Sequence, residues 1–265
     1  MNSWSIVVGV LFALACGATG GALFLHRARR LHQDEARYDL HTPHLPRVAT
    51  ALGAVTGIAI GFLLAYFASY SREFDLVAWI GRSSYILVVG SVGVQLMILG
   101  RIFFLLRREE ASMGRKPAPH TLSVKRQERW RALRQRYRHD VDLRAHDDDV
   151  VGELIGVLGT PLLNARRDQS RIPFYGYLGT VCGILLMARE LGGINEATET
   201  FRVLQSMAVG LVLAFQTTLV ALVAFLPLRK VTDLLAQRLD TIEESWLRSR
   251  DDESRSRDDD ESKKG

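Results

Sequence analysis

Hydroxyl side chains inside apolar segments are the groups in this chain best placed to do chemistry. Segments 173–188 and 206–228 contain no charged residue, yet the first holds Thr180 and the second holds Thr217 and Thr218. Within a bilayer, a hydroxyl donates and accepts hydrogen bonds where lipid offers none. A layer of such groups could therefore line a narrow hydrated path for an ion. The alternative is simple helix packing, with each hydroxyl bonded to a carbonyl of its own helix.

Small residues accompany these threonines at helical spacing. Gly176, Thr180 and Gly183 are four and three residues apart, which places them on one face of a helix. Helices in lipid associate through close contact of small residues, so we expect segments 173–188 and 206–228 to pack together. The expected packing and pore residues are Gly176, Gly179, Gly183, Gly210, Ala214 and Ala221.

Two prolines define the expected depth of the hydroxyls. Thr180 lies seven residues after Pro173, and Thr218 lies nine residues before Pro227. At 1.5 Å per residue these separations are about 10 and 14 Å. In two antiparallel helices, both hydroxyls would lie in one layer near the middle of the membrane. Pro173 and Pro227 would then shape the cytoplasmic mouths of the path.

The distribution of charge predicts an all-α polytopic membrane protein with five transmembrane helices. The 265 residues are 48% hydrophobic and 24% charged, but the apolar residues form blocks and most charges fall between them. A membrane-spanning helix needs about 20 apolar residues. Blocks that meet or approach this length are 4–25, 48–70, 85–106, 173–188 (extended to 193) and 206–228.

Arginine and lysine concentrate in alternate loops, which predicts the orientation of the chain. The N-terminus would face outward, and the C-terminus would face the cytoplasm. We expect a helix break near residues 147–149, and disorder in the highly charged C-terminal tail. The expected parts are an N-terminal transmembrane helix (1–25), a cytoplasmic linker (26–47), transmembrane helices 2 and 3 (48–106), a basic cytoplasmic helical region (107–172), transmembrane helices 4 and 5 (173–228), a cytoplasmic helical extension (229–248) and a disordered tail (249–265).

Other kinds of site find little support in the sequence. Cys16 and Cys182 lie inside apolar blocks, where they fit as small apolar side chains better than as a disulfide or metal pair. His41 and His44 could supply only half of a metal site. Because such a lone pair in a loop is usually solvated, no metal or other cofactor is expected. No Ser/His/Asp, Cys/His or phosphate-loop arrangement indicates an enzyme. Segment 1–25 lacks the basic start of a signal peptide.

The basic region around Trp130 has aromatic and arginine residues that could bind nucleic acid. Its position beside membrane helices makes the positive-inside bias and contact with membrane lipids the simpler explanation, so nucleic acid is not expected. A non-conducting membrane scaffold, which binds lipid or a soluble partner through this region, is the alternative to an ion-conducting function.

Two motifs resemble the MotA/TolQ/ExbB family of ion-driven membrane proteins. Residues 173–184, PFYGYLGTVCGI, are similar to the family pattern of an apolar pair, Gly, Leu-Gly-Thr-Val, one residue and Gly-Ile. Residues 210–227, GLVLAFQTTLVALVAFLP, resemble the last helix of the family. The order of a long cytoplasmic segment, two spans and a helical cytoplasmic tail also matches.

The resemblance implies an energy-transducing motor or stator complex of the bacterial inner (cytoplasmic) membrane, with the N-terminus periplasmic and the C-terminus cytoplasmic. Such subunits form a homo-pentamer around two copies of a single-span MotB/TolR/ExbD-like partner that carries a membrane Asp. Flow of H⁺ or Na⁺ would drive rotation or mechanical work. No carboxylate lies in the core of any expected span, and Glu190 stands near the end of one. The titrating acid would therefore come from another chain.

Three features leave the branch of the family open. Leu213 occupies the position where the TolQ/ExbB branch typically has Glu, and Cys182 replaces its common Trp. The flagellar-stator branch has an apolar residue at the position of Leu213, as here, but it lacks an equivalent of segment 1–25. The ion, the driven load and the role of that first segment are open as well.

Overall fold

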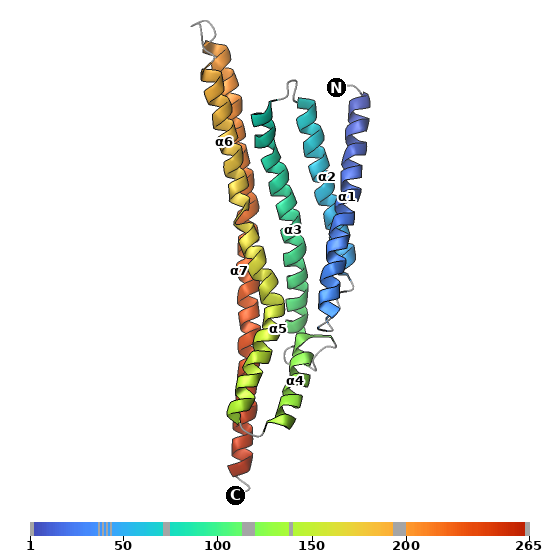
Figure 1. Cartoon of the computed structure of the whole chain (residues 1–265), viewed down its shortest axis with the longest axis vertical. Coiled ribbons are helices and arrows are strands. Elements are labelled where there is room, and N and C mark those ends of the chain that lie inside the picture. The colour runs from blue at the N-terminus through green and yellow to red at the C-terminus, as the bar shows by residue number, and fades with distance from the viewer. Residues whose placement is uncertain are drawn as a thin grey trace. The chain divides into compact units, whose positions relative to one another are not determined.

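The structure is a computed structural model that describes residues 3–36, 38, 40, 42, 44–70, 75–112, 120–137, 140–192 and 200–262. This part of the chain is helical and contains no strand, which confirms the all-α prediction. Five helical stretches within it are long and apolar enough to cross a membrane, so the multi-pass membrane assignment is also confirmed. The helices are α1 (Ser3–Ala36), α2 (Leu45–Tyr70), α3 (Leu76–Ser112), α4 (Leu122–Arg136), α5 (Asp140–Gln169), α6 (Ile172–Leu191) and α7 (Thr200–Ser262) (Figure 1).

The chain divides into two compact units. The first unit comprises Met1–Arg30, Pro43–Met97 and Ala165–Lys230, and the second comprises Leu31–Thr42, Ile98–Asn164 and Val231–Gly265. The first unit contains most of the apolar helical length, and the second contains most of the charged helices. Each unit is described below by its own contacts.

Glycines bring α1 and α2 of the first unit into backbone contact. A Cβ atom on Gly53 would lie 2.5 Å from the carbonyl oxygen of Gly20, and one on Gly61 would lie 2.7 Å from the Cα atom of Ala13. No side chain can occupy such distances, so only glycine allows the helices to approach this closely. The α2 glycines are spaced four residues apart on one face: Gly53, Gly57 and Gly61. The role of α1, open from the sequence, is thus to pack against α2.

A buried ion pair holds the end of α1 in the second unit. The Nε atom of Arg101, on α3, donates to Oε1 of Glu35 at 2.5 Å, and the side chains are 6% and 0% exposed. The hydroxyl of Thr42, which precedes α2, donates to the other Glu35 oxygen at 2.5 Å. Both carboxylate oxygens are therefore bonded, as a buried charge requires.

Replacing Glu35 by Ala should destabilise the protein by about 3–5 kcal/mol, because Arg101 would be left as a buried charge without its carboxylate. Thermal or denaturant unfolding of the purified protein measures this loss. The matched control is Glu153→Ala, which removes the exposed partner of Arg129 and should cost no more than about 1 kcal/mol. Equal losses for the two variants would show that the Glu35 pair does not stabilise the fold.

A second charged cluster joins α4, α5 and α7 within the second unit. Oδ2 of the fully buried Asp147 accepts hydrogen bonds from Arg126 and Arg250, each at 3.4 Å. The guanidinium of Arg126 also lies over the ring of Trp246, 5.6 Å from its centre. Arg250 forms a further short bond with Asp148. Residues 147–149 therefore lie inside α5, where the side chains of Arg126 and Arg250 bind Asp147.

This cluster corrects two sequence expectations. The helix break expected near residues 147–149 is wrong, because α5 runs through them and α4 ends before Tyr137 instead. Neighbouring arginines neutralise the carboxylates that were expected to interrupt the helix. The tail that was expected to be disordered over 249–265 is helical as far as Ser262, where α7 ends. Arg250 fixes the start of this tail on α5, and the helix extends from there.

The N-terminus of α4 is capped from another helix. Thr121 occupies the capping position but makes no side-chain bond to the helix. Instead, the buried carboxylate of Glu109 on α3 accepts hydrogen bonds from the backbone nitrogens of Leu122 and Ser123, at 2.5 and 3.2 Å. A negative charge at this position satisfies free N–H groups and interacts favourably with the helix dipole. Glu109 therefore fixes where α4 begins.

An exposed ion pair completes the contact between α4 and α5. Arg129 donates to Glu153 at 2.5 Å. This hydrogen bond with Glu153 raises the pKa of Arg129 above its ordinary value. A base with a raised pKa keeps its stabilising effect at every pH below the unfolded value and loses it only as the pH rises through the folded value. Arg129 therefore remains charged throughout the neutral range.

Candidate ion-pathway site

Helices α6 and α7 of the first unit position the predicted hydroxyls. Pro173 lies in the first turn of α6, where its missing N–H group costs no helical hydrogen bond. Pro227 lies inside α7 and does not end it. The two proline positions therefore differ: one begins a helix, and the other lies within a helix that continues into the 229–248 extension. Figure 1 shows α6 and α7 side by side.

The small residues predicted for this pair lie at its interface. A Cβ atom on Gly176 would lie 2.8 Å from Cβ of Ala221, and one on Gly183 would lie 2.5 Å from the carbonyl oxygen of Gly210 and 2.9 Å from Cβ of Ala214. The two backbones therefore meet along several turns. This close approach is what allows short side chains from the two helices to reach one another.

Thr180 and Thr218 face each other across this contact. Their Oγ1 atoms are 2.5 Å apart, so one hydroxyl donates to the other. Both oxygens also lie 3.2 Å from the carbonyl oxygen of Ala214, and Thr180 lies 3.2 Å from that of Gly176. The two hydroxyls thus lie side by side in one layer of the helix pair.

Counting protons shows what this pair can bind. Two hydroxyls carry two protons and four lone pairs. One proton is used between the threonines and the other can go to a backbone carbonyl, which leaves three lone pairs available. The pair can therefore accept a hydrogen bond from a protonated acid or offer oxygen ligands to a cation. Both side chains are half-buried, so each remains reachable.

Thr217 differs from its neighbour. It is 2% exposed, and its hydroxyl lies 3.0 Å from the carbonyl oxygens of Leu213 and Ala214 in its own helix. Its side chain occupies the space beside Gly179, where a Cβ atom would lie 2.5 Å from that of Thr217. The structure therefore places Thr217 in the interface between α6 and α7.

Helix α3 contacts the same pair through a glycine that sequence reasoning missed. A Cβ atom on Gly81 would lie 3.0 Å from Cβ of Cys182 and 3.1 Å from Cδ2 of Leu213. Nearby, the hydroxyl of Tyr85 lies 3.5 Å from Oε1 of Gln216. Cys182 and Leu213, the two positions noted above as differing from the TolQ/ExbB pattern, thus pack against one glycine. A larger side chain at either position would need a different α3 surface.

Charges lie at the ends of these helices. Arg189 pairs with Asp75, which directly precedes α3, 3.2 Å away. In the described part of the first unit, no carboxylate is buried. The described residues also contain no cluster of three or more His, Cys, Asp or Glu side chains that could hold a metal ion. His41 lies outside the described residues.

The paired hydroxyls of Thr180 and Thr218 lie in the part of the chain that matches a known protein family. Residues 169–247 match the MotA/TolQ/ExbB proton channel family. This confirms the resemblance seen in the two motifs, with the branch open. The MotA/TolQ/ExbB segment contains all of α6 and the part of α7 that carries Thr217, Thr218 and Pro227. Neither the curated proteins nor the solved structures gave a match.

Proposed function

We propose that the chain is the ion-conducting subunit of an inner-membrane motor, which couples proton or sodium flow to rotation or mechanical work through a single-span partner. The observation that carries this proposal is the 2.5 Å contact between the Thr180 and Thr218 hydroxyls. It lies inside the segment that matches a proton channel family. A hydroxyl pair with unused lone pairs suits the passage of a proton or sodium ion.

The chemistry of the spans supports a partner that supplies the acid. Proton transfer through a membrane needs a group that binds and releases a proton, and carboxylates commonly serve this purpose. Because the described part of the first unit buries no carboxylate, a membrane Asp of a MotB/TolR/ExbD-like partner would approach the threonine pair. When protonated, this Asp donates to a threonine oxygen. When ionised, it releases that bond and can move.

Assembly and orientation follow as part of the same proposal. Five copies of this chain would surround two partner helices, with the N-terminus periplasmic and the C-terminus cytoplasmic. The charge distribution supports this orientation, because arginines dominate residues 107–171 and begin again at Arg229. Gly176, Gly179 and Gly183 would allow close packing, and the chain would perform no enzymatic reaction and hold no resident cofactor.

A non-conducting scaffold is the second candidate. The threonine hydroxyls also lie near backbone carbonyls, as in ordinary helix packing. Exposed arginines at the end of α4, including Arg131, Arg134 and Arg136, offer a surface for an acidic partner or lipid. Under this function the hydroxyls would serve only packing, and the basic region would be essential.

The test is the mass of the complex purified after expression with the neighbouring genes. We expect five copies of this chain with two copies of a single-span protein that carries a membrane Asp. Measurement in both detergent and lipid nanodiscs controls for dissociation by detergent. A monomer or dimer without such a partner in both environments would contradict the motor and favour the scaffold.

A further inference from the structure

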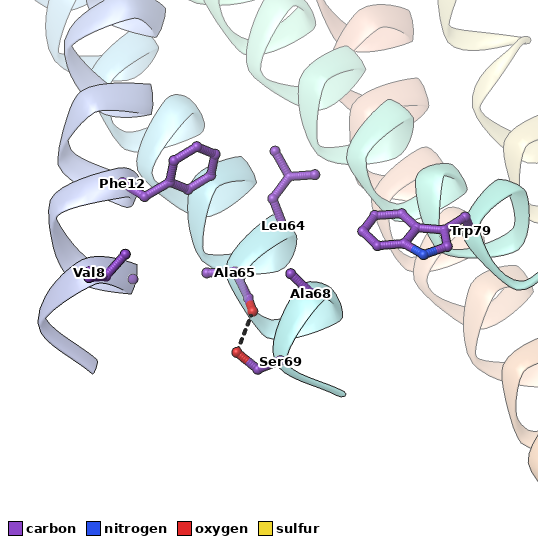
Figure 2. A pocket seen from close by; sticks show the side chains of 8 residues that line it. Val8, Phe12, Leu64, Ala65, Ala68, Ser69 and Trp79 are labelled. Atoms are coloured by element: carbon purple, nitrogen blue, oxygen red, sulfur yellow. Dashed lines mark hydrogen bonds between the residues drawn. The ribbon is translucent and has the colours of Figure 1, made fainter. Parts of the chain in front are cut away.

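An apolar groove lies between α1, α2 and α3 of the first unit, near the start of α1 and the end of α2. Its volume is about 660 Å³, within the range of pockets that hold small ligands, about 300–1,000 Å³. Figure 2 shows the rings of Phe12 and Trp79 pointing toward Leu64 from opposite sides. The lining residues are Val8, Gly9, Phe12, Leu64, Ala65, Ala68, Ser69 and Trp79.

The groove forms where α1 and α2 diverge from each other. At Gly61 a Cβ atom would lie 2.7 Å from the Cα atom of Ala13, so α1 and α2 touch there through their backbones. One turn further along α2, the nearest atom to a Cβ on Gly9 is Cβ of Ala65, 3.8 Å away. The helices thus separate toward this end. Small side chains line the widening space without filling it.

The chemistry of the lining limits the occupant. Ser69 supplies the one side-chain hydroxyl of the lining, and this hydroxyl donates to the carbonyl oxygen of Ala65 at 2.8 Å (Figure 2). Charged groups are absent from the lining residues. The only other polar side-chain group of the lining is the indole N–H of Trp79, so the groove offers mainly apolar contact, which suits a hydrocarbon chain.

The surroundings indicate where that hydrocarbon comes from. All three helices contain candidate membrane spans, and the groove residues lie within them. Val8 and Phe12 are 60% and 46% exposed, so the groove opens sideways to the membrane. Trp79 stands four residues after Asp75, near the beginning of its span, where tryptophan commonly marks the lipid headgroup level. A lipid of that leaflet can insert its chain directly.

We propose that this groove binds an acyl chain of a membrane phospholipid and retains it longer than the lipids around the rest of the protein. The acyl chain would fill the space between Phe12, Leu64 and Trp79 and complete the packing of α1 on α2 and α3. This inference is independent of ion conduction, because none of the groove residues belongs to the α6–α7 site.

A photoreactive phospholipid tests this binding. The full chain is placed in nanodiscs of phosphatidylethanolamine and phosphatidylglycerol that contain a lipid with a diazirine in its acyl chain, and labelled residues are mapped by mass spectrometry. We expect labelling at Phe12, Leu64 and Trp79 to exceed that around the exposed Val55 of α2 at least fivefold. Ala68→Phe, which fills the groove, should reduce this labelling at least fivefold.

The matched control is Val55→Phe, which adds the same ring to an exposed position of α2 outside the groove. It should leave groove labelling unchanged. Labelling spread evenly over the exposed apolar residues, or insensitive to Ala68→Phe, would overturn the proposal. Loss of groove labelling when the purified single-span partner is added would show that a protein helix occupies the groove, which overturns it as well.

Discussion

Replacing Thr218 by Val should reduce ion flux through the assembled complex by about tenfold to a hundredfold. Valine keeps the shape of threonine but removes the hydroxyl that lies 2.5 Å from Thr180. The interaction of this hydroxyl with the cation in transit, which is a charged group, contributes about 1.5–3 kcal/mol, and each 1.4 kcal/mol changes a rate tenfold. Flux into liposomes that contain the complex with its partner, measured with a pH- or sodium-sensitive dye, gives the result.

Two further variants distinguish this loss from a packing defect. Thr218→Ser retains a hydroxyl and should keep most of the flux. Thr50→Val removes a hydroxyl of α2 that bonds Pro46 in its own helix, so it should leave the flux unchanged. Stability should change by less than about 1 kcal/mol in Thr218→Val, because Thr180 keeps its backbone carbonyl partners. Normal flux in Thr218→Val would favour the scaffold function.

Replacing Gly183 by Leu should both destabilise the protein and abolish ion flux. Its first side-chain atom alone would lie 2.5 Å from the Gly210 carbonyl oxygen and 2.9 Å from the Ala214 nitrogen. These are backbone atoms, so the helices must move apart, and overpacking of this kind costs about 1–3 kcal/mol or more. The separation would also break the contact between Thr180 and Thr218. Thermal unfolding and liposome flux measure the two effects.

The control for this variant is Gly100→Leu on α3, because beyond the neighbouring backbone of α3 itself no atom lies within 4 Å of a Cβ atom at that position. It should unfold at close to the temperature of the unmodified protein. Gly183→Ala should show an intermediate effect, since its single methyl group meets the same atoms. An unfolding temperature for Gly183→Leu equal to that of Gly100→Leu would show that α6 and α7 do not pack as described.

The α6–α7 site was largely accessible from the sequence because its signals are local. Charge-free blocks indicate spans, and small residues three or four apart indicate a shared face. The glycines of α2 carry the same kind of signal and could have identified its contact with α1. Thr217 was harder to assign, because adjacent residues on a helix differ by about 100° in direction and only the position of the partner helix decides which hydroxyl is buried.

The second unit was much less predictable, because its decisive contacts connect distant residues. Glu35 and Arg101 are 66 residues apart, and Asp147 and Arg250 are 103 apart. Read alone, each charge resembles an ordinary solvated side chain near a membrane. The helical course of residues 147–149 depends on arginines from two other helices, and local sequence does not contain that information. Buried pairs of opposite charge therefore determine both the position of the end of α1 and the helical course of α5.

The glycine contacts also bear on the order in which the chain can assemble during synthesis. The backbone contacts at Gly53, Gly61 and Gly183 join helices that are neighbours in sequence, α1 with α2 and α6 with α7, so the loops that must close are short and their entropic cost is small. The α1–α2 contact has all its residues once Tyr70 is made, 130 residues (200 − 70) before α7 begins at Thr200. At about 5–20 residues per second, that interval is roughly 7–26 s. The first helical hairpin therefore has ample time to form before the threonine pair can exist.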